Sequence, residues 1–233
     1  MLTLAFDTSS KTASVALLDD ENIVYEVTIN SGRNHSELLL PAIERACASS
    51  GTHIRQIDLF ACSLGPGSFT GLRIGVGTLK GLMMATGRPA AGLSSLQCLA
   101  MNARNCRNVI GTMMDAGRGQ VYLAYFRTDA RGRLLPLSQE MAAAPQIISE
   151  CPYEEVTYVG DGAQKYAQLI SSAPGQNKIM SADFQFIRAA AAGLLALEKY
   201  REHNLLDLQK VLPVYLRSAD AVPPRPVFLR GNA

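Results

Sequence analysis

Two turns of the sequence place an aspartate at the end of an apolar run, followed by small residues. Asp7 follows the apolar residues 2–6 and begins the turn DTSS, and Asp115 follows residues 109–114 and begins DAGRG. Carboxylates are ligands for Mg²⁺, while hydroxyls and glycine amides bind phosphate. Both turns are therefore candidate loops for a nucleotide.

Each turn also has a simpler interpretation. DTSS has no glycine before Lys11, which hinders close approach of its amides to a phosphate, so a plain polar turn is favoured. In DAGRG, Gly117 and Gly119 give that freedom and Arg118 supplies positive charge, so a phosphate loop and a plain hairpin turn are equally favoured. The Gly-Asp-Gly turn at residues 160–162 could bind an anion, but such turns are common and an ordinary helix start is favoured.

Patterns of other catalytic classes are missing from the sequence. The three histidines, His35, His53 and His203, form no HxxxH pair, which disfavours a helical zinc site. There is no GxSxG motif of a serine hydrolase and no CxxC pair among the five cysteines. We therefore predict no metal site and no cofactor, and cysteines that are small buried side chains in a reducing compartment.

The most unusual stretch is GPGSFTGLRIGVGTLKG, residues 65–81. It lacks the Lys-Ser or Lys-Thr pair of a P-loop. We predict a helix that Ser68 caps and that ends near Ala85. One apolar face of this helix, directed toward the core, consists of Leu72, Val76, Leu79 and Met83.

The same helix carries five glycines in two runs. Gly67, Gly71 and Gly75 are four residues apart, and Gly77 and Gly81 repeat that spacing. Each glycine costs about 1 kcal/mol of helix stability relative to alanine. Close approach of another element usually offsets such a cost. The spacing leaves open whether that element is in the same lobe, in a second copy or in another protein.

Composition narrows the function classes. The chain has 233 residues, 48% of them apolar, and a net charge of +2, which gives no basic field of the kind that stand-alone nucleic-acid-binding proteins show. The first ten residues lack the basic and apolar regions of a signal peptide, and the apolar run at residues 189–197 is too short to span a bilayer. We expect a soluble cytoplasmic protein without membrane contact.

The elements that must position these turns repeat along the chain. In the first half we expect strands at 2–6, 13–18, 23–29, 59–63 and 90–93, with helices from about Asn34 to Gly51, over the glycine-rich stretch and up to Ala103. Asn34 and Glu37 resemble a capping box, and Pro41 should kink the first helix or delay its start. In the second half we expect strands at 109–114, 121–126, 134–141 and 156–159, with helices at 144–150, 161–170 and 183–202.

Both halves thus contain three hairpin-linked strands followed by alternating helices and strands, as in a duplicated unit. The predicted fold class is α/β, with two ribonuclease-H-like lobes of the actin, Hsp70 and sugar-kinase ATPase fold and mixed sheets flanked by helices. The predicted lobes are residues 1–105 and 106–210. Residues 211–233 are predicted to form a C-terminal segment with a flexible tail.

Six segments together resemble the TsaB (YeaZ) family of bacterial proteins. They are DTS at residues 7–9, HSELLLP at 35–41, GPGSFTGLRIG at 65–75, DAGRGQVY at 115–122, GDGA at 160–163 and PVYLR at 213–217. The resemblance covers nearly the whole chain. It implies an accessory subunit in the synthesis of threonylcarbamoyladenosine beside the tRNA anticodon. The implied partners are a TsaD-like catalytic subunit, a TsaE-like ATPase and, in isolation, a second copy, with tRNA contacted only indirectly.

The resemblance also implies a contact surface on the helices that carry HSELLLP and GPGSFTG. The residues that it implies are His35, Leu38, Leu39, Ile43, Gly67, Ser68, Phe69, Gly71, Leu72, Arg73, Gly75 and Val76. Periodicity does not decide which of the apolar ones face inward. If the glycines face a second copy, Gly71→Leu or Gly75→Leu should abolish the dimer and leave the monomer folded.

One segment separates the chain from the catalytic relatives that it resembles. Where TsaD has a motif resembling GVNHLEGHL, residues 92–100 read GLSSLQCLA, with Ser95 and Leu99 at the positions of two metal-binding histidines. This favours a non-catalytic member, in which the nucleotide-loop residues are vestigial; these are Asp7, Thr8, Ser9, Asp115, Gly117 and Arg118. Gln120 stands where members often have glutamate. The alternatives are a small ATP-dependent kinase or ATPase of the same fold, and a metallopeptidase-like hydrolase, which the histidine count disfavours.

Overall fold

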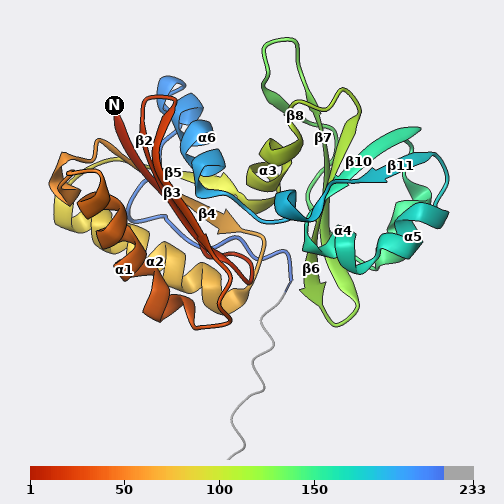
Figure 1. Ribbon diagram of the computed structural model, residues 1–233, viewed down its shortest axis with the longest axis horizontal. Helices are drawn as coiled ribbons and strands as arrows, with labels where there is room; N and C mark the ends of the chain where they lie inside the picture. Colours follow the sequence, from red (N-terminus) through yellow and green to blue (C-terminus); the bar gives the residue numbers. More distant parts are fainter. Residues whose placement is uncertain (218–233) are drawn as a thin grey trace, which may run out of the picture.

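A computed structural model describes residues 1–217, so the predicted flexible tail from residue 218 onward lies outside the described residues. Two sheets with flanking helices lie next to each other (Figure 1). The first sheet has the order β3-β2-β1-β4-β5, from β1 (Leu2–Asp7), β2 (Ala13–Asp19), β3 (Asn22–Ile29), β4 (Leu59–Gly65) and β5 (Ala90–Ser94). The second has the order β11-β10-β6-β7-β8, from β6 (Val109–Gly117), β7 (Gln120–Thr128), β8 (Leu134–Pro136), β10 (Glu155–Val159) and β11 (Gln176–Ile179), while β9 (Met141–Ala143) also pairs with β7.

The two sheets share one topology, which confirms the predicted duplication. In the first, β1 pairs antiparallel with β2 and parallel with β4. In the second, β6 pairs antiparallel with β7 and parallel with β10. Asp7 is the last residue of β1, and Asp115 lies near the end of β6. The two aspartate turns therefore occupy equivalent places in the two lobes.

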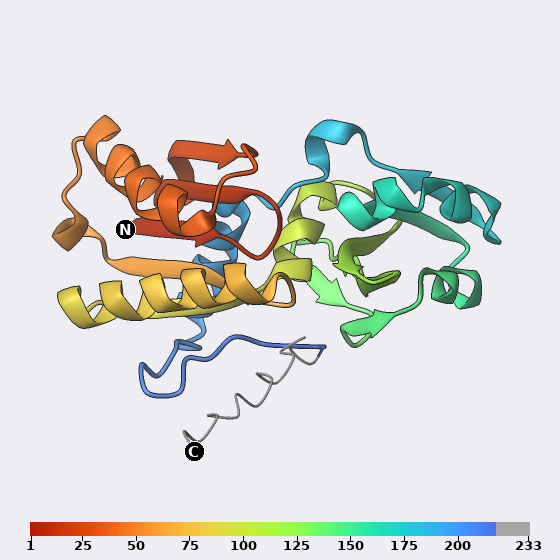
Figure 2. The ribbon, with the colours of Figure 1, turned by 90° about the horizontal axis from the view of Figure 1, so that it is seen from below.

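Helices cover the sheets and also cross between the lobes. Helices α1 (His35–Ser49) and α2 (Phe69–Thr86) cover one face of the first sheet, and α4 (Asp161–Lys165) and α5 (Ala167–Ser172) flank the second (Figures 1 and 2). Helix α3 (Ser95–Ala100) follows the first sheet but packs on β6 and β7, whereas α6 (Ala189–Arg201) follows the second but packs on β1 and β2. Short 3₁₀ helices span Ile54–Gln56, Met101–Ala103, Pro145–Glu150 and Ala182–Phe184.

The return of α6 to the first sheet corrects the predicted assignment of residues 106–210 to the second lobe. The helix begins with four alanines and includes Gly193, so it can lie very close to the sheet. A Cβ atom at Gly193 would stand 2.4 Å from Leu18 Cδ1 of β2. The small side chains of α6 thus allow it to pack on the first sheet. The apolar pattern of the helix did not indicate which sheet it would contact.

The ends of the two major helices were predicted with different success. Ser68 caps α2, since its hydroxyl accepts a bond from the Gly71 amide at 3.3 Å, and Gly87 ends it in the left-handed conformation. The capping box at α1 is wrong, because the Asn34 side-chain amide donates to Glu37 Oε1 instead of accepting a backbone bond. Helix α1 begins at His35 and continues through Pro41, so a delayed start is also wrong.

Five elements of the second half differ from the prediction. The strand expected at 134–141 is two short strands, since the Ser138 hydroxyl accepts the Tyr125 amide bond that a continuing β8 would use. The helix at 144–150 is 3₁₀, and the one at 161–170 breaks at Tyr166. Strand β11 was missed. Helix α6 starts only at residue 189, because the Asn102 amide binds the carbonyls of residues 184 and 186 in the segment before it.

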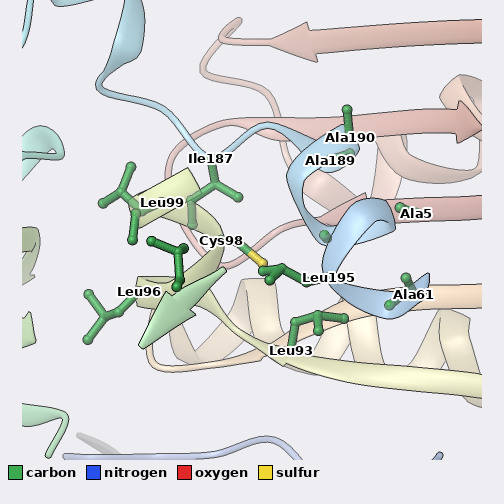
Figure 3. Packing of buried hydrophobic residues seen from close by; sticks show 14 of the residues in the cluster. Ala5, Ala61, Leu93, Leu96, Cys98, Leu99, Ile187, Ala189, Ala190 and Leu195 are labelled. Atoms are coloured by element: carbon green, nitrogen blue, oxygen red, sulfur yellow. The ribbon is translucent and has the colours of Figure 1, made fainter. Parts of the chain in front are cut away.

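The hydrophobic core joins the two lobes. One cluster lies between the first sheet, α1 and α2, and another lies on the α4 side of the second sheet. The largest cluster includes Leu93 from β5, Leu99 from α3, Leu195 from α6 and Met114 from β6, and so spans both lobes (Figure 3 shows part of it). Within residues 1–217, no helix combines the length and apolar character needed to cross a membrane.

Candidate functional site

A cleft of about 790 Å³ lies between the lobes and is lined by three of the six candidate nucleotide residues, Ser9, Asp115 and Gly117. Its first-lobe wall includes Ser9, Lys11 and the N-terminal residues of α1 and α2, and its second-lobe wall includes Asp115, Gly117 and Asp161. Asp7 and Thr8 do not line the cleft and are buried behind it. Arg118 is exposed at the β6–β7 turn, outside the lining.

The Asp7 carboxylate is directed inward and is bound by its own turn. Its Oδ1 accepts the Ser9 hydroxyl at 2.7 Å and its Oδ2 accepts the Ser9 amide at 3.3 Å. Complete burial raises the pKa of Asp7, and hydrogen bonds from Ser9 and Ser63 oppose this rise only in part. A carboxylate enclosed in this way does not fit the role of a ligand for a cleft-bound Mg²⁺.

Residues 8–10 of this turn are held by the starts of α1 and α2. The Thr8 hydroxyl donates to Gly71 O at 2.7 Å, and the Ser68 amide donates to Ser9 O at 2.7 Å. His35 Nε2 lies 2.9 Å from Ser10 O, so it carries a proton that it donates to this carbonyl. Two carbonyls and one hydroxyl of the turn are therefore used for packing against the two helices.

Three glycines at and just before the start of α2 make this packing possible. A Cβ atom would stand 2.2 Å from Ser9 O at Gly67 and 2.0 Å from Thr8 O at Gly71, and 2.5 Å from the Thr8 hydroxyl at Gly75. Such distances are far below van der Waals contact, so only glycine fits. The neighbour that this glycine run admits is the chain's own turn.

This geometry corrects the expected behaviour of Gly71→Leu and Gly75→Leu. Both positions are buried inside the first lobe, and a leucine would displace the turn at residues 8–10. A purely intermolecular glycine face would leave the monomer of these variants folded. Here the substitutions should instead disrupt the fold of the monomer. By contrast, a Cβ atom at Gly77 or Gly81 would meet nothing within 4 Å, and both residues are exposed.

The second aspartate turn is occupied by an internal ion pair. Lys165 Nζ lies 2.9 and 3.0 Å from the Asp115 oxygens, and the Gly117 amide donates to Asp115 at 3.0 Å. Burial acts to raise the pKa of Asp115, but the bonds from Lys165 and Gly117 outweigh it and lower that pKa. The Asp115 amide in turn donates to Asp161, a carboxyl whose pKa burial raises. The charge on Asp115 is thus already balanced by the chain.

Ser95 and Leu99, which the resemblance placed at the positions of two metal-binding histidines, do not fit a metal. Ser95 is completely buried in α3, and Leu99 is 1% exposed and belongs to the core shared by the lobes. Neither side chain supplies an imidazole or carboxylate ligand. Across residues 1–217, no three His, Cys, Asp or Glu side chains form a group that could hold a metal ion.

The predicted contact residues divide by exposure into two sets. One set is buried and faces the sheet or the Asp7 turn, which settles the orientation that periodicity left open; it comprises Leu39, Ile43, Gly71, Leu72, Gly75 and Val76. The other set is exposed or half-buried and comprises His35, Leu38, Gly67, Ser68, Phe69 and Arg73.

The predicted contact set lacks four exposed residues on the outer sides of α1 and α2. Leu40 is 52% and Met84 73% exposed, unusual values for large apolar side chains, and Gly77 and Gly81 lie open to solvent. For the two glycines, the sequence did contain a signal for their outward orientation. Residue 77 is about 200° around the helix from residue 75, so the second run had to lie opposite the first.

Comparisons with known proteins agree with the fold. The model of the family "TsaD: tRNA N6-adenosine threonylcarbamoyltransferase" matches residues 23–217. The chain is 30% identical to the tRNA threonylcarbamoyladenosine biosynthesis protein TsaB of Escherichia coli, over 94% of the chain and 95% of the relative. The structure of YeaZ from Pseudomonas aeruginosa is 27% identical with a TM-score of 0.80, covering 92% of the chain and 99% of the relative.

A more distant structural likeness extends to sugar kinases. A polyphosphate/ATP-glucomannokinase from Arthrobacter is 8% identical with a TM-score of 0.53, covering 87% of the chain and 99% of the kinase. At this identity the likeness concerns the fold alone. It confirms the predicted class of two lobes in the architecture shared with sugar kinases.

Proposed function

The chain belongs to the TsaB (YeaZ) group of the TsaD family, and from this we propose that it is a non-catalytic subunit of a tRNA-modifying complex. In this role it binds and activates a TsaD-like catalytic subunit, which transfers threonylcarbamoyl to adenosine beside the tRNA anticodon. A TsaE-like ATPase completes the complex. The isolated chain forms a homodimer, works in the cytoplasm without a cofactor, and meets tRNA only through its partners.

The observation that carries this proposal is the internal use of both aspartate turns. Asp7 is bound by Ser9 and sealed beneath α2, and Asp115 is paired with Lys165. An ATP-dependent enzyme of this fold needs these turns free for phosphates and Mg²⁺. The vestigial character predicted for Asp7, Thr8, Ser9 and Asp115 is in keeping with this geometry, so the proposed activity resides in the partner.

We place the contact surface on the outer side of α1 and α2. Leu40 and Met84 offer exposed apolar area, and Arg73 adds a charged group beside the half-buried Phe69. Gly77 and Gly81 lack side chains, so a helix of the partner can approach the backbone of α2 closely. The buried members of the predicted set, such as Leu39 and Val76, hold the two helices on the sheet from behind.

The effect of docking is conformational. A subunit that binds only the active arrangement of its partner raises the population of that arrangement by the difference in its affinity for the two states. The chain needs no reacting group for this role. Its requirement is a rigid surface, which the packing of α2 on the Asp7 turn provides.

Reconstitution of tRNA modification tests the proposal. Purified TsaD-like and TsaE-like subunits, ATP, an activated threonylcarbamoyl donor and unmodified tRNA are assayed with and without this chain, and modified adenosine is quantified. We expect modification to depend on the chain. Equal modification without it would refute the partner role.

As a control, ATP and Mg²⁺ are titrated into the isolated chain by calorimetry; micromolar binding together with turnover would favour the kinase alternative.

A further inference from the structure

We propose that residues 204–217 form a strap that couples the outer face of α2 to the second lobe. This segment follows α6 and passes beside α2 on its way to the second lobe (Figure 2). Its contacts fall into three groups, with the first sheet, with the start of α2 and with the β6–β7 turn. Together they make a mechanical link across one side of the interlobe cleft, whose lining includes Tyr215 and Arg217.

The first sheet anchors the strap. The Leu206 amide donates to Ala90 O of β5 at 2.8 Å, and the Val214 amide donates to Leu64 O of β4 at 2.7 Å. Between them, Val211 is 1% exposed and packs in the core beneath α1 and α2. Gly65 allows the closest approach, because a Cβ atom there would stand 2.2 Å from Val214 O. The strap up to residue 214 therefore moves with the first lobe.

Tyr215 ties the next part of the strap to α2. Its ring lies 4.7 Å from the Phe69 ring, and its hydroxyl accepts a bond from Arg73 Nε at 3.4 Å. Arg73 also lies over Phe69, with 3.9 Å from its guanidinium carbon to the ring centroid. Arg73 is exposed and Tyr215 is 39% exposed, so this three-residue stack is accessible from outside.

Arg217 reaches the second lobe two residues later. One of its terminal nitrogens donates to Ala116 O at 2.6 Å and to Gly117 O at 3.2 Å. Charged donors make stronger bonds to carbonyls than neutral ones. The turn that accepts them is the one that carries Asp115. Residues 117–119 of this turn all have φ between 51° and 72°, so three consecutive residues adopt the left-handed conformation and form a tight turn.

Arg73 of α2 is thus connected to the second lobe through residues 215–217 of the strap. A group that engages Arg73 or Phe69 from outside alters the stack on Tyr215, and Tyr215 is two residues from the latch at Arg217. Changes at the outer face of α2 should therefore change how firmly the β6–β7 turn is held. Where the ligand at that face is the catalytic subunit, the inference rests on the proposed function; in the isolated chain it does not.

Hydrogen exchange of the isolated chain, read by mass spectrometry on peptides covering residues 115–121, tests the strap. Arg217→Ala removes the latch, and we expect exchange in this turn to rise by about tenfold, the change that corresponds to one or two lost bonds. Arg73→Ala should raise exchange in the same turn by about threefold, although the substitution lies in the first lobe. Arg45→Ala, at an exposed arginine of α1, removes the same charge and should change nothing there.

Two results would overturn the inference. Unchanged exchange in Arg217→Ala means that there is no latch, and a change in Arg217→Ala without one in Arg73→Ala means that the latch is not coupled to α2. Circular dichroism melting of each variant shows that the fold is retained. If it is not for Arg217→Ala, Arg217→Lys keeps the charge and loses the guanidinium geometry, and should give a smaller rise.

A second arm adds the purified TsaD-like subunit to the wild-type chain. Binding that changes exchange at residues 115–121 supports the coupling. Binding that leaves this turn unchanged contradicts the coupling while the proposed function stands. Failure to bind at all counts against the proposed function, and the exchange of the isolated variants then still decides the strap.

Discussion

Helix α2 and the residues just before it carry two runs of glycine with opposite surroundings. At Gly67, Gly71 and Gly75, a Cβ atom would stand 2.0 to 2.5 Å from atoms of Thr8 and Ser9. At Gly77 and Gly81 it would meet nothing within 4 Å. Both runs have the same four-residue spacing, and each glycine inside the helix has the same cost in helix propensity. The spacing of the glycines therefore indicates that another element approaches the helix closely. Only the direction in which each run faces shows whether that element belongs to the same lobe or to a partner.

The two runs also differ in what they do for the cleft. The inner run seats the Asp7 turn against the helix, where the Thr8 hydroxyl donates to Gly71 O and the Ser9 carbonyl accepts from the Ser68 amide. The outer run leaves a smooth strip between exposed apolar side chains, of which Met84 is 73% exposed. One face of α2 thus packs on the first aspartate turn, and the other lies open to a partner. Substitutions on the two faces should have opposite effects.

The largest effect is expected on the inner face. Gly71→Ala places a methyl group 2.0 Å from a backbone oxygen that cannot move aside without unseating the turn. We expect the free energy of unfolding to fall by about 3 kcal/mol, at the upper end of the cost of overpacking. Urea unfolding of the isolated chain measures it. A loss below about 1 kcal/mol would mean that the inner glycines are not needed for packing.

The outer face should respond in the opposite direction. Gly77→Ala adds a methyl group to open solvent within the same helix and removes backbone freedom from the unfolded chain. We expect a gain of about 0.5–1 kcal/mol in the isolated chain, seen as a rise in Tm of about 2–4 °C. A lower Tm would place an unrecognised neighbour against this face.

The smallest effect concerns pH, and it separates the two aspartate turns. An aspartate whose pKa is raised by folding stabilises the protein fully below its unfolded pKa, about 4, and this contribution is lost as the pH rises through the folded value. Burial raises the pKa of Asp7, so Asp7→Asn should remove a decline in stability above pH 4. Urea midpoints between pH 4 and pH 7 measure this slope.

Asp115 provides the matched control. Its pKa is lowered in the fold, because the bonds from Lys165 and Gly117 outweigh the effect of burial. Its contribution is present above pH 4 and is lost on acidification through the folded pKa. Asp115→Asn should therefore lower stability near neutral pH and leave the slope assigned to Asp7 unchanged. Identical pH profiles for the two variants would contradict the distinction between the turns.

Much of the fold could be predicted from the sequence because its signals are local. Apolar runs ending in aspartate marked β1 and β6, and Ser68 with Gly87 marked the ends of α2. The repeat of these signals predicted two equivalent sheets. The elements that were wrong depend on distant bonds. The start of α6 is set by Asn102, and the end of β8 by a hydroxyl that binds a strand amide.

The candidate site was less predictable than the fold. The residue types of the two turns were found, but whether Asp7 faces the cleft or the core depends on how α2 docks. The buried contact residues, such as Leu72, and the exposed ones, such as Leu40, have the same chemistry and differ only in their position around a helix. The role of Tyr215 could not be read either, since its partner Phe69 is about 146 residues away.

The most direct test of the account is the affinity of the TsaD-like subunit for Gly81→Leu. A leucine at this position fills the open strip on the outer face and touches nothing within the lobe. We expect a fold as stable as the wild type and binding at least about tenfold weaker, or 1.4 kcal/mol, by calorimetry. Gln168→Leu, which adds the same side chain to an exposed site on α5, should bind like the wild type. Undiminished binding by Gly81→Leu would contradict the claim that this protein acts through the outer face of α2.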